Sequence, residues 1–123
     1  MAQPLQHPRA AAVLSQATVR AAGQLDLQQR QLALLLGLSA ATVSRLAAGA
    51  WRLTEGTKSW ELAAAFVRLY RSLAAITGGG TEAMRAWLHS DNDALGARPA
   101  ERILSAEGLF DVVRYLDAAR GRI

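Results

Sequence analysis

Residues 31–46, with the sequence QLALLLGLSAATVSRL, decide the fold of the N-terminal half of this chain. The stretch holds two short helix-forming segments on either side of Gly37, which can adopt the positive φ of a tight turn. Ala33 is small enough for the second helix to cross over the first, and Val43 and Leu46 fill the angle between them. This spacing predicts a helix-turn-helix. The alternative is an ordinary antiparallel helix pair with a glycine C-cap.

The flanking residues continue the helical pattern in both directions. Upstream, residues 9–22 predict a first helix that ends at Gly23 in the left-handed conformation, and Asp26 is the expected N-cap of the next helix. The inner face of the first helix is expected to consist of Val13, Leu14, Ala17 and Val19. Downstream, residues 50–57 predict a loop, and residues 58–76 predict the longest helix. That helix is apolar nearly all round, so we expect it to be both a central strut and half of a dimer interface.

The composition agrees with an all-α fold. The chain has 123 residues and a hydrophobic content of 51%, which suffices for one packed domain or two very small ones. Alanine, leucine and arginine dominate, whereas strand-favouring residues are sparse. No apolar run is long enough to span a membrane, and the first residues lack the order of a signal peptide, so we expect a cytoplasmic protein without membrane contact.

Enzymatic function is not expected. The chain has no cysteine, and His7 and His89 lie far apart in polar surroundings, so no metal site or nucleophilic triad can be assembled with a familiar spacing. Gly78, Gly79 and Gly80 follow no strand and precede no lysine-serine pair, so they indicate a helix break rather than a phosphate loop. We therefore expect no cofactor and no metal. The three tryptophans are interpreted as core anchors.

The exposed face of the second motif helix supplies the candidate DNA contacts. The net charge of +4 favours a polyanionic partner. Only Arg45 could make the bidentate guanine contact that gives strong discrimination, whereas hydroxyl groups and the helix N-terminus suit phosphates. The predicted DNA-binding residues are Ser39, Thr42, Ser44, Arg45 and Arg52. Because so few side chains could contact bases, specific binding would need a second half-site from a dimer or larger assembly.

A second informative stretch, residues 87–116, reads WLHSDNDALGARPAERILSAEGLFDVVRYL. From the residues alone it predicts a polar loop after a tryptophan, a helical turn that begins at Pro99, and a final amphipathic helix capped by Ser105. The inner face of that helix would carry Leu109, Val112, Val113 and Leu116. These features predict a small helical subdomain and no specific function.

As a pattern, the same stretch closely resembles the Xre/MbcA/ParS antitoxin family. The matching residues are Trp87, Leu88, Asn92, Leu95, Gly96, Pro99, Leu104, Gly108 and Val113. The resemblance covers about residues 66–119, and the upstream helix-turn-helix extends it over most of the chain. It implies a bacterial antitoxin that pairs with a RES-domain toxin, an enzyme that consumes NAD or transfers its ADP-ribose. It also implies a C-terminal region that covers the NAD cleft of the toxin, dimerisation, and repression of the antitoxin's own operon.

The C-terminal tail offers chemistry that suits such a cleft. Small residues can enter a narrow site, guanidinium groups can pair with an acidic side chain, and the terminal carboxylate can occupy a pyrophosphate site. We predict that Arg120, Arg122 and Ile123 plug the toxin, with the other toxin-binding residues being Arg114, Asp117 and Gly121. The alternative is a frayed basic end that interacts with the helix dipole.

These interpretations divide the chain into three regions. Residues 1–8 are expected to form a flexible arm, residues 9–57 a helix-turn-helix DNA-binding region, and residues 58–123 a region for dimerisation and toxin binding. The expected partners are a cognate RES-domain toxin, operator DNA and a second copy of the chain. The main alternative is a stand-alone transcriptional repressor whose C-terminal half only dimerises.

Overall fold

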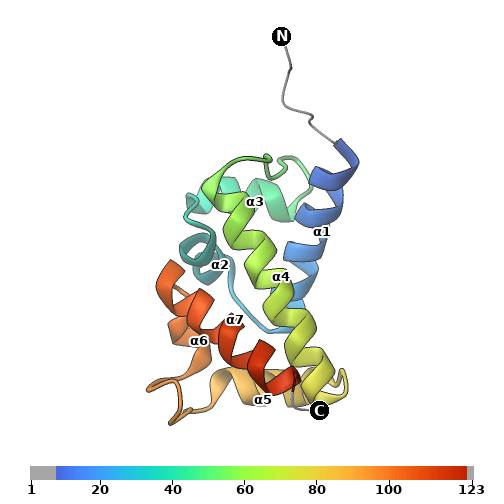
Figure 1. Ribbon diagram of the computed structural model, residues 1–123. Coiled ribbons are helices and arrows are strands. Elements are labelled where there is room, and N and C mark those ends of the chain that lie inside the picture. Colours follow the sequence, from blue (N-terminus) through green and yellow to red (C-terminus); the bar gives the residue numbers. More distant parts are fainter. Residues whose placement is uncertain (1–7, 122–123) are drawn as a thin grey trace.

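The computed structural model describes residues 8–121, which form seven helices and no strand (Figure 1). The all-α prediction is therefore confirmed for this part of the chain. The helices are α1 (Pro8–Gln24), α2 (Gln29–Leu36), α3 (Ala40–Ala47), α4 (Lys58–Thr77), α5 (Thr81–His89), α6 (Pro99–Arg102) and α7 (Ala106–Arg120).

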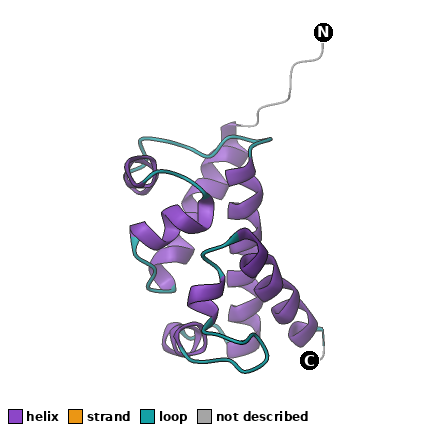
Figure 2. Cartoon of the chain, turned by 90° about the vertical axis from the view of Figure 1, so that its left-hand side faces the viewer, coloured by secondary structure: helices purple, strands orange, loops and turns teal. Residues whose placement is uncertain are grey.

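Helix α4 runs through the middle of the molecule (Figure 1) and packs against α1, α2, α5 and α7. Its residues Phe66, Leu69 and Leu73 are completely buried in a core to which both halves of the chain contribute. Viewed from the side, α4 and α1 connect the upper group of helices to the lower one (Figure 2). The sequence-based prediction of a central strut is thus confirmed. Because the two halves share this strut, they form one packed body.

The end of α1 differs from the prediction. Gly23 lies inside the helix, which continues to Gln24, and the left-handed φ of +59° belongs to Asp26. A tertiary contact supports these two additional residues, since the Arg85 guanidinium of α5 donates to the carbonyl oxygens of Gln24 at 2.8 Å and Gly23 at 3.1 Å. Asp26 is accordingly not the N-cap of α2. That position is taken by Gln28, whose backbone N–H donates to the side chain of Gln31.

The prediction for the inner face of α1 is confirmed for Leu14 and Val19, which pack against the core, and is wrong for Val13. Val13 is 56% exposed, and the buried side chains are the small or polar ones of Ser15, Thr18, Ala21 and Ala22. The hydroxyls of Ser15 and Thr18 can be buried because each is hydrogen-bonded, Thr18 donating to the Leu14 carbonyl at 2.7 Å. Val13 lines a groove between α1 and α4 instead of entering the core.

None of the helices in residues 8–121 is long and apolar enough to cross a lipid bilayer. Of the predicted arm, residues 1–7 lie outside the described part of the chain, and Pro8 is the first residue of α1.

Candidate functional sites

Helices α2 and α3 have the geometry that the sequence predicted. Gly37 ends α2 with a φ of +67°, and its backbone N–H and that of Leu38 donate to carbonyl oxygens of the last turn. Val43 and Leu46 of α3 are buried between the two helices, and Ala33 is nearly so. The Ser39 hydroxyl caps α3 by accepting from the Thr42 backbone N–H at 3.1 Å. These contacts fix the angle of the helix-turn-helix.

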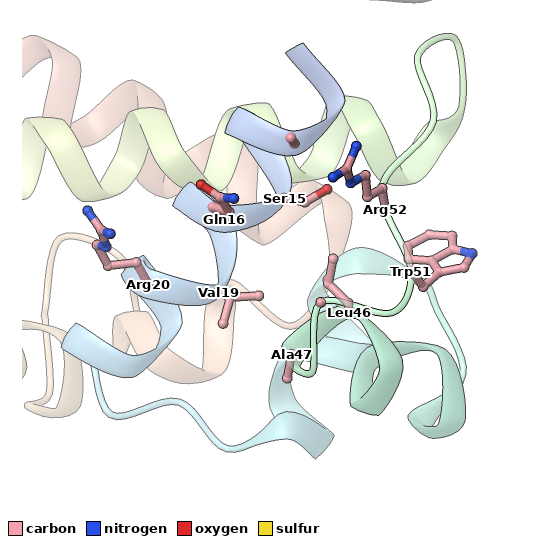
Figure 3. Close-up of a pocket in the computed structure, with 10 residues that line it drawn as sticks. Ser15, Gln16, Val19, Arg20, Leu46, Ala47, Trp51 and Arg52 are labelled. Atoms are coloured by element: carbon pink, nitrogen blue, oxygen red, sulfur yellow. The ribbon is translucent and has the colours of Figure 1, made fainter. Parts of the chain in front are cut away.

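The five predicted DNA-binding residues fall into two groups. Ser39, Thr42 and Arg45 form a chain of side-chain hydrogen bonds along α3, in which Thr42 accepts from Arg45 at 3.3 Å and from Ser39 at 2.9 Å. Ser44 lies on the same exposed helix. Arg52 lies instead in the loop after α3, beside α1 (Figure 3). The Thr42 bond directs the Arg45 side chain back along α3.

Predicted toxin-binding residues lie on α7, where a polar cluster joins α7 to α4. The Asp117 carboxylate pairs with Arg68 of α4 at 2.7 Å and accepts from the Ser72 hydroxyl at 3.1 Å. The Arg120 guanidinium donates to the same hydroxyl at 3.5 Å. Ser72 is buried in an otherwise apolar part of α4, so these bonds satisfy its hydroxyl and set the direction of the last turn of α7.

Arg114 belongs to a second cluster on α7, centred on Asp111. This carboxylate accepts from Arg114 and from Arg102, the last residue of α6. It thereby ties α6 to α7 from the side, while Arg114 itself stays largely exposed. Gly121 is exposed at the end of α7, and the predicted residues Arg122 and Ile123 lie outside the described part of the chain.

The structure explains why two glycines and the asparagine occupy their positions in the pattern from Trp87 to Val113. Gly96 has a φ of +72° in a loop where the Asn92 side chain accepts from the Leu95 backbone N–H at 3.2 Å. At Gly108, an added Cβ would lie 1.9 Å from the carbonyl oxygen of Arg102. The first turn of α7 can therefore touch the end of α6 only because residue 108 has no side chain.

Two protein-family models match the chain. The antitoxin Xre-like helix-turn-helix domain matches residues 4–68, more than half of the sequence, and the antitoxin Xre/MbcA/ParS C-terminal toxin-binding domain matches residues 72–122. This chain belongs to the Xre/MbcA/ParS antitoxins. A comparison with curated proteins found no match.

The two domains of this antitoxin meet within α4. The helix-turn-helix match covers α1 to α3 and the first half of α4, and the toxin-binding match begins at Ser72 and includes α5, α6 and α7. Two side chains of α5 also join the two domains. Arg85 binds the end of α1, and the His89 ring nitrogen lies 3.0 Å from the Leu25 carbonyl oxygen. The regions matched by the two family models therefore share one hydrophobic core in this chain.

Several residues at these sites were not singled out from the sequence. Arg68 and Ser72 hold Asp117, and Trp60 and Phe110 line a groove of about 760 Å³ between α4 and α7. The signal for Ser72 was present, because a serine among buried apolar residues of a helix needs a partner. The groove had no comparable signal, since it depends on how α7 lies across α4. Among the described residues, no group of three or more His, Asp or Glu side chains could hold a metal ion.

Proposed function

We propose that this antitoxin acts in a type II toxin–antitoxin pair, where it neutralises a RES-domain toxin by covering the NAD cleft of that toxin. The observation that carries the proposal is the match to the toxin-binding domain, which ends at residue 122, directly beyond α7. The chain itself is proposed to have no catalytic role and to work in the cytoplasm as a binding protein.

The proposed plug is the segment that leaves α7. Arg120 and Gly121 are exposed at the end of this helix, and Arg122 and Ile123 follow. The cluster of Asp117, Arg68 and Ser72 supports the proposal because it holds the last turn of α7 in one direction. A held helix end lowers the entropy lost when the tail enters a cleft. In this proposal Asp117 orients the tail, and the exposed Arg114 contacts the rim of the toxin.

Co-expression tests the proposal. The chain is expressed beside the product of its neighbouring gene, and growth, NAD level and co-purification are followed. We expect the neighbour to be toxic alone, and we expect growth to recover together with a stable complex. A neighbour that is harmless and forms no complex would favour the stand-alone repressor.

A truncated chain tests whether neutralisation requires the tail or only the rest of the antitoxin surface. Deletion of residues 120–123 should abolish neutralisation while the helical circular dichroism spectrum and the melting temperature change little. The matched control is R98A, which removes one arginine from an exposed loop. Growth rescue by the truncated chain would disprove the plug.

We also propose that the helix-turn-helix represses the antitoxin's own operon. Ser39, Thr42 and Ser44 would contact phosphates or base edges, and Arg45 would contact guanine. The support is an α3 whose N-terminus and exposed face bear these groups. Binding of the duplex upstream of its own gene, but not of an unrelated duplex of equal length, would be the expected result.

The second half-site is proposed to come from a homodimer. Most of α4 is covered by the chain's own helices, so the exposed surface left for a partner includes α1 and α7 as well. Val13, Ala64 and Phe110 line two neighbouring grooves there, of about 560 and 760 Å³. Exposed apolar side chains on neighbouring helices support an interface of this kind. A monomeric mass by light scattering at micromolar concentration would contradict it.

A further inference from the structure

A hollow of about 420 Å³ lies between α1 and the end of α3. Figure 3 shows Gln16 and Arg20 on α1, together with Ala47 of α3 and the loop that carries Arg52. The two arginines lie at opposite ends of the hollow, on different elements. Apolar side chains form its floor. The hollow therefore presents two separate cations over a neutral surface.

The charge around this hollow is of one sign. No carboxylate lines it, and α1 contains no acidic residue. Among the described residues, Arg20 and Arg52 take part in no ion pair, and both are exposed. Two arginines that meet no anion within the chain are suited to an anion from outside it.

The loop that bears Arg52 is held in place. The backbone N–H of Leu53 donates to the buried hydroxyl of Ser15 at 2.9 Å, and the Leu53 side chain is buried in the core. Arg52 is therefore fixed beside α1 by its neighbour in sequence. This bond also explains why a serine occupies the buried face of α1.

The hollow borders the helix that is proposed to enter the major groove, because Leu46 and Ala47 of α3 line it. A helix in the major groove has a phosphate strand on each side of it. We propose that Arg20 and Arg52 bind the phosphodiester backbone of one of these strands, with the Gln16 amide as a further donor. This inference rests on the proposed DNA binding and adds α1 to the interface.

The test measures how binding depends on salt. Fluorescence anisotropy titrations use a labelled duplex of unrelated sequence and the duplex upstream of the gene, each over a series of salt concentrations. One phosphate contact contributes about 0.9 to the slope of log K against log salt. R20A should therefore lower this slope by about 0.9 and weaken binding about five-fold near 0.15 M salt, equally on both duplexes. R52A should behave alike, and the double variant should lose about twice the slope.

The control variant R98A removes the same charge from the loop between α5 and α6 and should leave the curves unchanged. If the wild-type chain binds neither duplex, the proposed repression fails, and this inference fails with it. If the wild type binds and R20A behaves like R98A, DNA binding stands and the inference alone is wrong. If R20A instead reduces co-purification of the toxin with unchanged DNA curves, the anion is a partner's carboxylate, which also overturns it. Melting temperatures of all variants verify that they are folded.

Discussion

In residues 9–52, no arginine takes part in an ion pair among the described residues, whereas Arg68, Arg102 and Arg114 each meet a carboxylate of α7. Arginine side chains thus have different surroundings in the two halves of the chain. In the helix-turn-helix half the guanidinium groups face solvent, where they can bind an external anion. Further along the chain, Arg68 and Arg102 join α4 and α6 to α7 through Asp117 and Asp111, and Arg114 pairs with Asp111 within α7.

The comparison teaches that net charge alone does not locate an interface. The whole chain carries a formal charge of +4, yet Arg68 of α4 and Arg102 of α6 pair with carboxylates of α7. Arg20, Arg45 and Arg52, on α1, α3 and the loop after α3, take part in no ion pair among the described residues and remain available to a polyanion. The following predictions test this division, from the largest expected effect to the smallest.

The largest effect is expected for G108A, at the junction that Asp111 and Arg102 hold together. An added Cβ would lie 1.9 Å from a backbone oxygen of α6, so α6 and α7 must separate. We expect a loss of at least about 3 kcal/mol of unfolding free energy, because backbone cannot move aside as a side chain can. Urea denaturation followed by circular dichroism measures it.

The matched control is G23A. Gly23 lies within α1 with an ordinary helical φ, and nothing lies within 4 Å of an added Cβ. An alanine there should leave stability unchanged or raise it by about 0.5–1 kcal/mol. Equal effects of G108A and G23A would show that the close approach of α6 and α7 does not limit stability.

On the DNA-binding side, R45A should reduce discrimination between the upstream duplex and an unrelated one. A bidentate arginine–guanine contact contributes about 1–3 kcal/mol of discrimination, so the specificity ratio should fall about five-fold or more. Anisotropy titrations on both duplexes give this ratio. If R45A weakens both duplexes equally, Arg45 contacts phosphate and base recognition lies elsewhere on α3.

A smaller effect is expected for D117A, which removes the acceptor shared by Ser72 and Arg68. The Arg68 side chain is 66% exposed, so its ion pair contributes little, and most of the loss comes from the buried Ser72 hydroxyl. We expect about 1 kcal/mol of destabilisation by urea denaturation. The double variant S72A/D117A should cost less than the sum of the single changes, since both remove the same bond. Full additivity would contradict the cluster.

The smallest effect is expected for R98A. Its partner Asp91 lies 3.3 Å away, but both side chains are mostly exposed. Exposed pairs of this kind contribute between about 0 and 1 kcal/mol, so we expect a change below about 0.5 kcal/mol. Stability, DNA binding and growth rescue should all remain near the wild-type values. A large loss in any of them would assign Arg98 to an interface.

Much of the helix-turn-helix could be predicted from the sequence because its determinants are local. A glycine in the turn, a serine cap and two apolar residues at helical spacing act within sixteen residues. The course of α1 could not be predicted in the same way. Its last turn depends on Arg85, which is about 60 residues away in sequence but adjacent in space.

The site residues show the same difference between local determinants and contacts between distant segments. Arg45 and Ser39 could be chosen from the sequence, because the exposed face of a short helix follows from its period. Arg20 could not, since its relevance depends on how α1 lies beside α3. Asp117 was chosen as a toxin contact, and only the packing of α7 on α4 brought Arg68 and Ser72 to it.

By itself, the sequence determined the all-helical class, the turn at Gly37, the cap at Ser39 and the antitoxin family, since these depend on short-range spacing and local backbone preference. The tertiary structure alone decided which arginines remain available, where Val13 points, and which residues share a groove. Those properties depend on the relative positions of helices, which arise from many weak contacts between distant segments. Such contacts leave no short signature in the order of the residues.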